Sequence, residues 1–141
     1  MTLADAEELL GPGRPHPAIR MKGPDIDGYP YAWGGLKLDV TRRAVSGIRI
    51  QLRPGSTVEL PAPVLPGSEP VEATVDREEL VRALDAAGCE HHVNDRLTFG
   101  RQSSILARPG DVYAVFGLPG RDDDVPHRDR PYLSVMRTYA P

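Results

Sequence analysis

Residues 29–52 read YPYAWGGLKLDVTRRAVSGIRIQL, and this stretch decides the fold. It holds three runs in which every second side chain is apolar or aromatic, at 29–33, 36–40 and 45–52. Alternation with a period of two is typical of a β-strand that buries one face. Because the links between the runs are short, we expect three consecutive antiparallel strands with a turn at 41–44.

A helix is expected on the N-terminal side of these strands. Apolar residues recur at helical spacing over 3–10, Thr2 stands three residues before Asp5 as in a capping box, and Gly11 ends the pattern. The intervening residues 12–28 are rich in proline and glycine, and little regular structure is expected there.

The same order of elements returns in the second half of the chain. Residues 76–88 predict a helix in which Asp76 and Glu79 have capping-box spacing. Apolar runs at 103–107, 112–117 and 132–137 then predict three strands, and the sequence around Leu97 and Phe99 is compatible with a further short one.

Five prolines fall between the two halves, within residues 53–75. A segment of this composition is extended rather than helical, so we interpret residues 54–75 as a proline-rich linker between a first unit, 1–53, and a second unit, 76–141. One helix with three strands buries too little surface to be stable alone. We therefore predict an α+β protein in which two α-β-β-β units form an antiparallel sheet, with the helices packed on one face.

Composition excludes several classes of function. The chain has 141 residues and a net charge of −3, which argues against binding to nucleic acid because phosphates demand a basic surface. The start, MTLADAEELL, does not have the pattern of a signal peptide, and no apolar run reaches the roughly 18 residues that span a bilayer. A cytoplasmic location without membrane contact is expected.

Cys89, His91 and His92 are the residues that most resemble a metal site. Zinc needs about four such ligands, and adjacent histidines in one strand point to opposite faces, so no metal site is predicted. Cys89 follows the end of a helix, which disfavours a reactive thiolate. No phosphate-binding loop or other cofactor motif is present. The sequence leans against an enzyme and predicts no catalytic residue and no cofactor.

Aromatic residues alternate on the first strand, at Tyr29, Tyr31 and Trp33. One interpretation places them in the core, because the inward face of a strand usually takes the aromatics. The other places them on an exposed sheet face as binding residues, with Arg49 near them on the third strand, since Tyr, Trp and Arg dominate binding energy at interfaces.

A triplet of acids, Asp122, Asp123 and Asp124, lies within the charged segment RDDDVPHRDR (121–130). The spacing does not fit a calcium loop. Two interpretations stay open: a solvated loop, or a loop that contacts a basic protein partner.

The pieces EELLGPGRP (7–15), YPYAWGGLKLDV (29–40) and VSGIRI (45–50) carry a resemblance to known families. In order and spacing they resemble the small outer-membrane lipoprotein units of the SmpA/OmlA type and the doubled form in the beta-lactamase inhibitory protein family. This resemblance implies a tandem helix-plus-three-strand fold. The chain departs from both families, because it has neither a lipobox cysteine nor disulfide cysteines.

In length, acidity and composition the chain also resembles small cytoplasmic toxin-immunity proteins of actinobacteria. Together with the open sheet face, this favours a non-enzymatic protein-binding module, an immunity protein or inhibitor that neutralises a toxin or enzyme by occlusion. Two alternatives stay open: a small-molecule-binding protein or enzyme with its site in a cleft between the units, and a structural subunit of a larger assembly.

Overall fold

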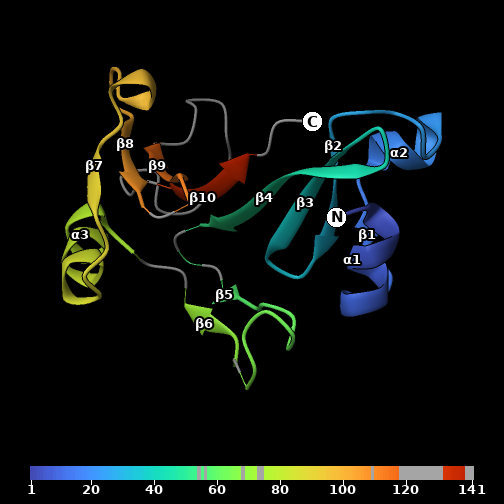
Figure 1. The fold of residues 1–141 in the computed structure, drawn as a ribbon, viewed down its shortest axis with the longest axis horizontal. Coiled ribbons are helices and arrows are strands. Elements are labelled where there is room, and N and C mark those ends of the chain that lie inside the picture. Colours follow the sequence, from blue (N-terminus) through green and yellow to red (C-terminus); the bar gives the residue numbers. More distant parts are fainter. Residues whose placement is uncertain are drawn as a thin grey trace. The chain divides into compact units, whose positions relative to one another are not determined.

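The structure is a computed structural model that describes residues 1–53, 55, 57–67, 69–72, 75–108, 110–117 and 132–138 (Figure 1). The chain divides into two compact units. Unit 1 contains Met1–Ile50 and Val58–Val71, and unit 2 contains Gln51–Thr57 and Glu72–Arg137. Most of the predicted linker thus belongs to unit 1 instead of standing apart from both units.

Unit 1 begins with helix α1, Leu3–Leu10, which has the predicted capping box. The backbone N–H of Asp5 donates to Thr2 Oγ1 (3.2 Å), and the Asp5 carboxylate accepts from the N–H of Thr2 (2.7 Å). Each end of the box therefore satisfies a donor that the first helical turn leaves without an intrahelical partner.

The segment 12–28 is more regular than its composition suggested. It contains a two-residue strand, β1 (Arg14–Pro15), and a short helix, α2 (Pro17–Lys22). His16 caps α2 by accepting the N–H of Ala18 at Nδ1, and Pro17 takes the first helical position, where a missing N–H costs nothing. The expectation of an irregular loop was wrong because His16 and Pro17 together start a helix.

The four strands of unit 1 pair antiparallel in the order β1-β2-β3-β4. The three longer ones, β2 (Tyr29–Trp33), β3 (Leu36–Thr41) and β4 (Ala44–Leu52), match the three predicted runs. The register sets Trp33 beside Leu36 and Leu36 beside Ile50, so their side chains share one face.

The core of unit 1 lies on that face. Its buried side chains come from both helices and two strands: Ala6, Ile19, Tyr31, Trp33, Leu36, Leu38 and Val40. Trp33 is 7% exposed, and its indole N–H donates to the carbonyl of Gly11 (2.8 Å). The end of α1 is therefore fixed to β2 through a single tryptophan.

Unit 2 has the second predicted helix, α3 (Arg77–Ala86), with the capping box between Asp76 and Glu79. Its strands pair antiparallel in the order β10-β9-β8-β7. Three match the predicted runs: β8 (Ser103–Ala107), β9 (Val112–Gly117) and β10 (Tyr132–Thr138).

The fourth strand of unit 2 lies earlier in the chain than the region around Leu97 and Phe99, where the sequence was compatible with a short strand. It is β7 (His91–Val93), whereas Leu97 belongs to the short 3-10 helix η1 (Asp95–Leu97) and Phe99 makes only an isolated bridge to Gln102. The prediction of a short strand around Leu97 and Phe99 was therefore wrong.

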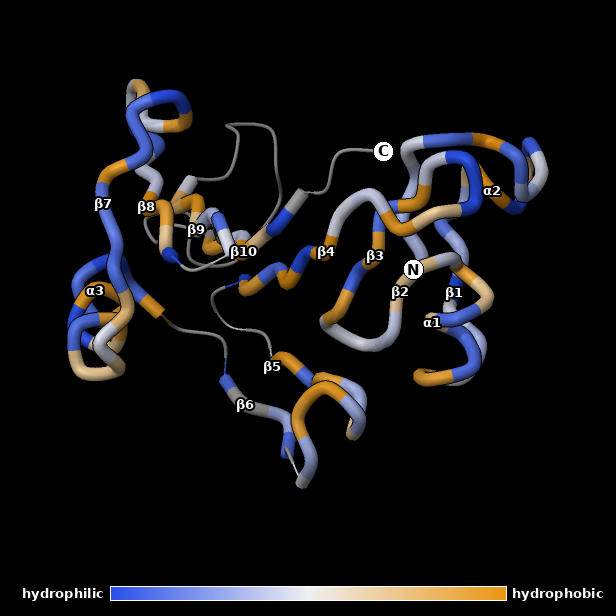
Figure 2. Tube along the Cα trace, viewed as in Figure 1, coloured by the Kyte–Doolittle hydropathy of each residue, from blue (hydrophilic) through white to orange (hydrophobic). Residues whose placement is uncertain are grey.

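The core of unit 2 forms between its sheet and α3. Ile105, Ala114, Phe116 and Leu133 are buried, and Leu80, Val81 and Leu84 of α3 pack against them. These hydrophobic segments of α3, β8 and β9 are orange in Figure 2. Leu80, Val81 and Leu84 form the apolar face of α3.

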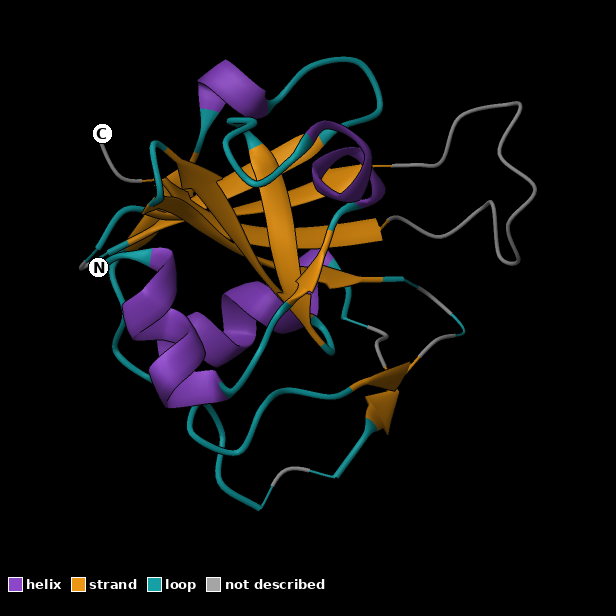
Figure 3. Ribbon diagram, turned by 90° about the vertical axis from the view of Figure 1, so that its right-hand side faces the viewer, coloured by secondary structure: helices purple, strands orange, loops and turns teal. Residues whose placement is uncertain are grey.

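A separate two-stranded sheet forms from β5 (Thr57–Val58) and β6 (Val71–Glu72), the two short arrows of Figure 3. None of the helices described above is long and apolar enough to cross a membrane. The α+β class and the antiparallel pairing of the strands are confirmed. The packing of both predicted helices on one face stays a prediction.

Candidate protein-binding surface

The aromatic residues of β2 lie in the core. Tyr31 and Trp33 are 8% and 7% exposed, and Tyr29 packs half-buried against the same cluster, where its ring stacks on that of His16 with centroids 5.1 Å apart. Of the two interpretations of this strand, the core interpretation holds. Tyr31 and Trp33 do not form an exposed binding surface.

Arg49 points to the opposite side of the unit 1 sheet. It forms an ion pair with Asp39 of the neighbouring strand, and the two side chains are 37% and 24% exposed. The strand registers place Lys37 and Arg14 on this same side. We call this side, defined by Arg14, Lys37, Asp39 and Arg49, the outer face of unit 1. It is charged, as expected of a solvated face.

The three aspartates of the acidic triplet, Asp122, Asp123 and Asp124, lie outside the described residues. Their role as partner-binding residues stays a prediction.

Of the residues that resembled a metal site, the two histidines point to opposite sides of β7. His91 Nε2 lies within hydrogen-bond distance of the Asp85 carboxylate of α3 (2.8 Å). His92 is exposed on the other side of β7. Within the described ranges, no group of three or more His, Cys, Asp or Glu side chains is placed to hold a metal ion.

An apolar surface that the sequence interpretation missed lies on the unit 2 sheet. Alternation along the strands directs Ile105, Ala114 and Phe116 into the core, so the residues between them point to the other side. Besides Ser104, Ser134 and Gly117, these include four apolar residues, Leu106, Tyr113, Val115 and Met136, which are all half-buried; Leu106, Tyr113 and Met136 are paired across the strands. We call this side the outer face of unit 2.

A signal for this surface was present in the sequence. The run VYAVFG (112–117) is almost continuously apolar, instead of alternating as LKLDVT (36–41) does. A strand with this pattern is apolar on both of its faces.

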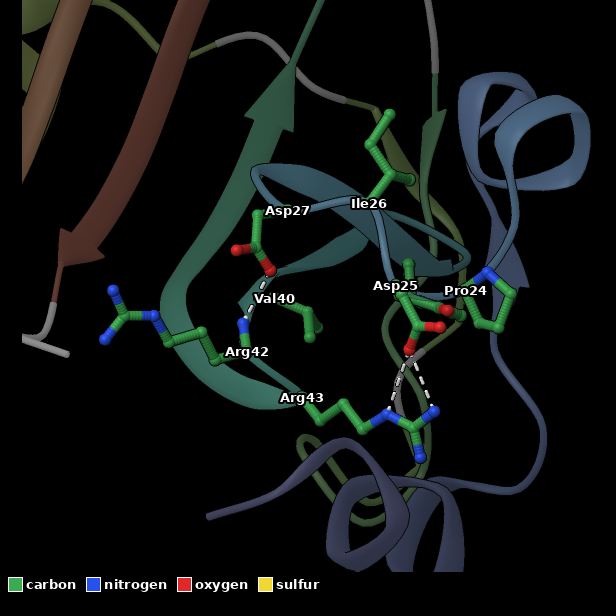
Figure 4. A pocket seen from close by; sticks show the side chains of 8 residues that line it. Pro24, Asp25, Ile26, Asp27, Val40, Arg42 and Arg43 are labelled. Carbon is green, nitrogen blue, oxygen red and sulfur yellow. Dashed lines mark hydrogen bonds and ion pairs between the residues drawn. The ribbon is translucent and has the colours of Figure 1, made fainter.

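The β3–β4 turn forms a second polar feature, in unit 1. Arg42 and Arg43 both have positive φ, 51° and 62°, as a type I′ turn requires. The N–H of Arg42 donates to Asp27 (2.6 Å), and the guanidinium of Arg43 pairs with Asp25 (2.9 Å), which raises the pKa of Arg43. Figure 4 shows the Arg43 side chain directed to Asp25 and the Arg42 guanidinium pointing away from both aspartates.

These residues border a shallow cleft of about 280 Å³ that also includes Pro24 and Ile26. Its acids already pair with the arginine turn. Both aspartates of this cleft therefore hold the β3–β4 turn.

Comparisons with protein-family models, with curated proteins and with solved structures give no match to this chain. The resemblance to the SmpA/OmlA-type and beta-lactamase inhibitory protein families stays a prediction.

Proposed function

We propose that this chain is a non-enzymatic protein-binding module that neutralises a protein partner by occlusion, as an immunity protein or inhibitor does. The observation that carries the proposal is the outer face of unit 2. There, four apolar side chains from three strands stand side by side outside the hydrophobic core of the unit.

The composition of this face fits a protein interface. Tyr and Met are enriched in the buried centre of interfaces, where charged residues are depleted. The outer face of unit 1 carries Arg14, Lys37, Asp39 and Arg49 instead. This contrast between two units of similar layout supports binding through unit 2.

The acidic triplet has a place in the same proposal. Asp122, Asp123 and Asp124 belong to the connection between β9 and β10, the two strands that supply Tyr113 and Met136. A toxin or enzyme with a basic active site would be attracted by these carboxylates, and coverage of that site would block its activity. The single cysteine fits a reducing compartment, so the cytoplasm is the proposed location.

The test is a pull-down with the tagged full chain from the lysate of its own source, at low and high salt. We expect one protein in stoichiometric amount, and less of it with Met136→Lys or with the charge reversal D122K/D123K/D124K. Two controls should bind as the unaltered chain does: Arg14→Glu, on the outer face of unit 1, and E7K/E8K, on α1.

The activity of the captured partner then tests whether the chain blocks its active site. Addition of the purified chain should abolish the partner's own activity at a ratio of about one to one, without covalent change to either protein. If nothing is captured at either salt concentration, or if the captured protein keeps full activity in the complex, the proposal is wrong.

A further inference from the structure

The connection between β7 and β8, which we call the 94–102 loop, holds an exposed aromatic side chain. Phe99 is 61% exposed, in contrast to Tyr31 and Trp33, which are buried in the core of unit 1. Figure 1 shows this loop, in yellow and orange, extending beyond the ends of β7 and β8. Isolated exposed hydrophobics are common, so exposure alone indicates nothing.

Hydrogen bonds fix the base of the 94–102 loop to the sheet. The N–H of Asn94 donates to the carbonyl of Ser104 (2.9 Å), and the hydroxyl of Thr98 donates to the carbonyl of Asn94 (2.9 Å). The same hydroxyl accepts the N–H of Ser104 (3.1 Å). The loop is thus attached to β8 from both of its sides.

Its tip is equally well fixed. Phe99 and Gln102 exchange both backbone hydrogen bonds, at 3.1 and 2.9 Å, around a two-residue turn in which Gly100 has φ +57°. The side-chain amide of Gln102 donates to the carbonyl of Leu97 (2.8 Å). Phe99 therefore stands on a preorganised support, and its binding to a partner would order little additional chain.

Charge surrounds the exposed ring on both sides in sequence. Arg96 and Arg101 are exposed, and the only acid of the loop is Asp95. Arginine and aromatic residues are the types that dominate interface energetics, and arginine pairs with carboxylates in a bidentate manner. A complementary surface would be apolar where it meets Phe99 and acidic at its rim.

The loop adjoins the outer face of unit 2. Ser104, to which its base is bonded, lies on that face of β8, and Leu106 follows on the same face about 7 Å further along the strand. Ser104 is fully buried beneath its surroundings, whereas Leu106 is half-buried. The loop that carries Phe99 is thus bonded to the same strand, β8, that supplies Leu106 to the apolar face.

We propose that the 94–102 loop is the anchor of the interface: Phe99 enters an apolar pocket of the protein partner, and Arg96 and Arg101 pair with carboxylates at the rim of that pocket. This inference rests on the proposed protein-binding function and adds to it the contact residue and the chemistry of the partner's surface.

The experiment measures the affinity of the captured partner for variants of the full chain. We expect Phe99→Ala to weaken binding about 30-fold or more, the range of an interface anchor. The matched control is Leu9→Ala on α1, because Leu9 is 63% exposed and lies in the other unit. Both variants should keep the melting temperature of the unaltered chain, since neither side chain is in a core.

Two further measurements test the chemistry. R96Q/R101Q should weaken binding about 10-fold and reduce its dependence on salt, because long-range attraction is lost. A photoreactive phenylalanine analogue at position 99 should crosslink to partner residues that form an apolar pocket with Asp or Glu at its edge, whereas the same analogue at position 9 should give no crosslink.

The outcomes separate the two proposals. If a partner is captured and inhibited but binds Phe99→Ala and Leu9→Ala equally well, or if position 99 crosslinks to a basic surface, the anchor is wrong and the protein-binding function stands. If the unaltered chain captures no partner, the proposed function fails and the anchor fails with it.

Discussion

Gly13 shows how one residue controls the core of unit 1. A Cβ atom at this position would lie 2.5 Å from Cζ2 of Trp33, closer than two carbon atoms can approach. Since Trp33 is also held by its hydrogen bond to Gly11, the indole has little freedom to move away. A glycine is therefore required at position 13 by contact with the tryptophan.

Gly13→Ala should accordingly destabilise the protein by about 2 kcal/mol, the usual cost of overpacking a core. Urea denaturation measures the change. Gly117→Ala is the control, because its Cβ would meet only Gln102 Oε1 at 3.8 Å, and it should cost clearly less. Equal losses for the two variants would contradict the role given to Trp33.

Asp5 should make the stability of α1 sensitive to acid. Its pKa lies below the ordinary value because its carboxylate accepts the backbone N–H of Thr2 and is further hydrogen-bonded to the Thr2 side chain. Folding lowers this pKa, so the contribution of Asp5 is complete above the ordinary aspartate value of about 4 and is lost as the pH falls through the lower folded value. A carboxyl NMR titration checks the direction, and Asp5→Asn should flatten the acid limb of the stability profile. A carboxyl group that titrates at or above the ordinary value would refute this account.

Among the elements, the β3–β4 turn has a sequence that conflicts with its conformation. Its two central residues are arginines at positive φ, where Asn-Gly is the preferred pair. Asp27 and Asp25 hold the turn from one side, and the N–H of Leu3 donates to the carbonyl of Arg43 (3.1 Å) from another. The surroundings therefore impose the turn on residues that do not favour it.

Replacement of the turn by R42N/R43G should raise the melting temperature by a few degrees, because the backbone strain is relieved. The lost ion pair between Arg43 and Asp25 is exposed at both ends and contributes little. Arg43→Lys, which keeps the Cβ atom, should give no such gain. A lower melting temperature for R42N/R43G would mean that the arginine contacts outweigh the strain.

At the scale of the elements, the sequence predicted the helices and strands that have a periodic apolar pattern. Both capped helices and all six strands with apolar runs were predicted, since alternation and capping residues are local signals. Helix α2 was missed although His16 and Pro17 form a helix start, because the surrounding prolines and glycines suggested a loop. The 94–102 loop was not predicted: hydrogen bonds from the side chains of Thr98 and Gln102 fix its backbone, and no sequence pattern specifies those bonds.

At the scale of the whole molecule, the repeated order of elements conceals a difference between the units. Each core is built from one face of antiparallel strands and from capped helices, α1 and α2 in unit 1 and α3 in unit 2. The outer faces differ, with Arg49 and Asp39 on unit 1 against Tyr113 and Met136 on unit 2. Aromatic residues are common both in cores and at interfaces, so residue type alone does not distinguish the two. The strand register does, because it shows which side chains share a face.

Trp33, described above as the link between α1 and β2, is also the only tryptophan of the chain. Its fluorescence emission therefore reports on unit 1, while unit 2, whose core is formed without tryptophan, contributes nothing to that signal. Far-ultraviolet circular dichroism records the backbone of both units. Superimposable unfolding curves from the two spectroscopic signals would indicate one cooperative transition, and separated curves would give each unit its own denaturation midpoint without a single substitution.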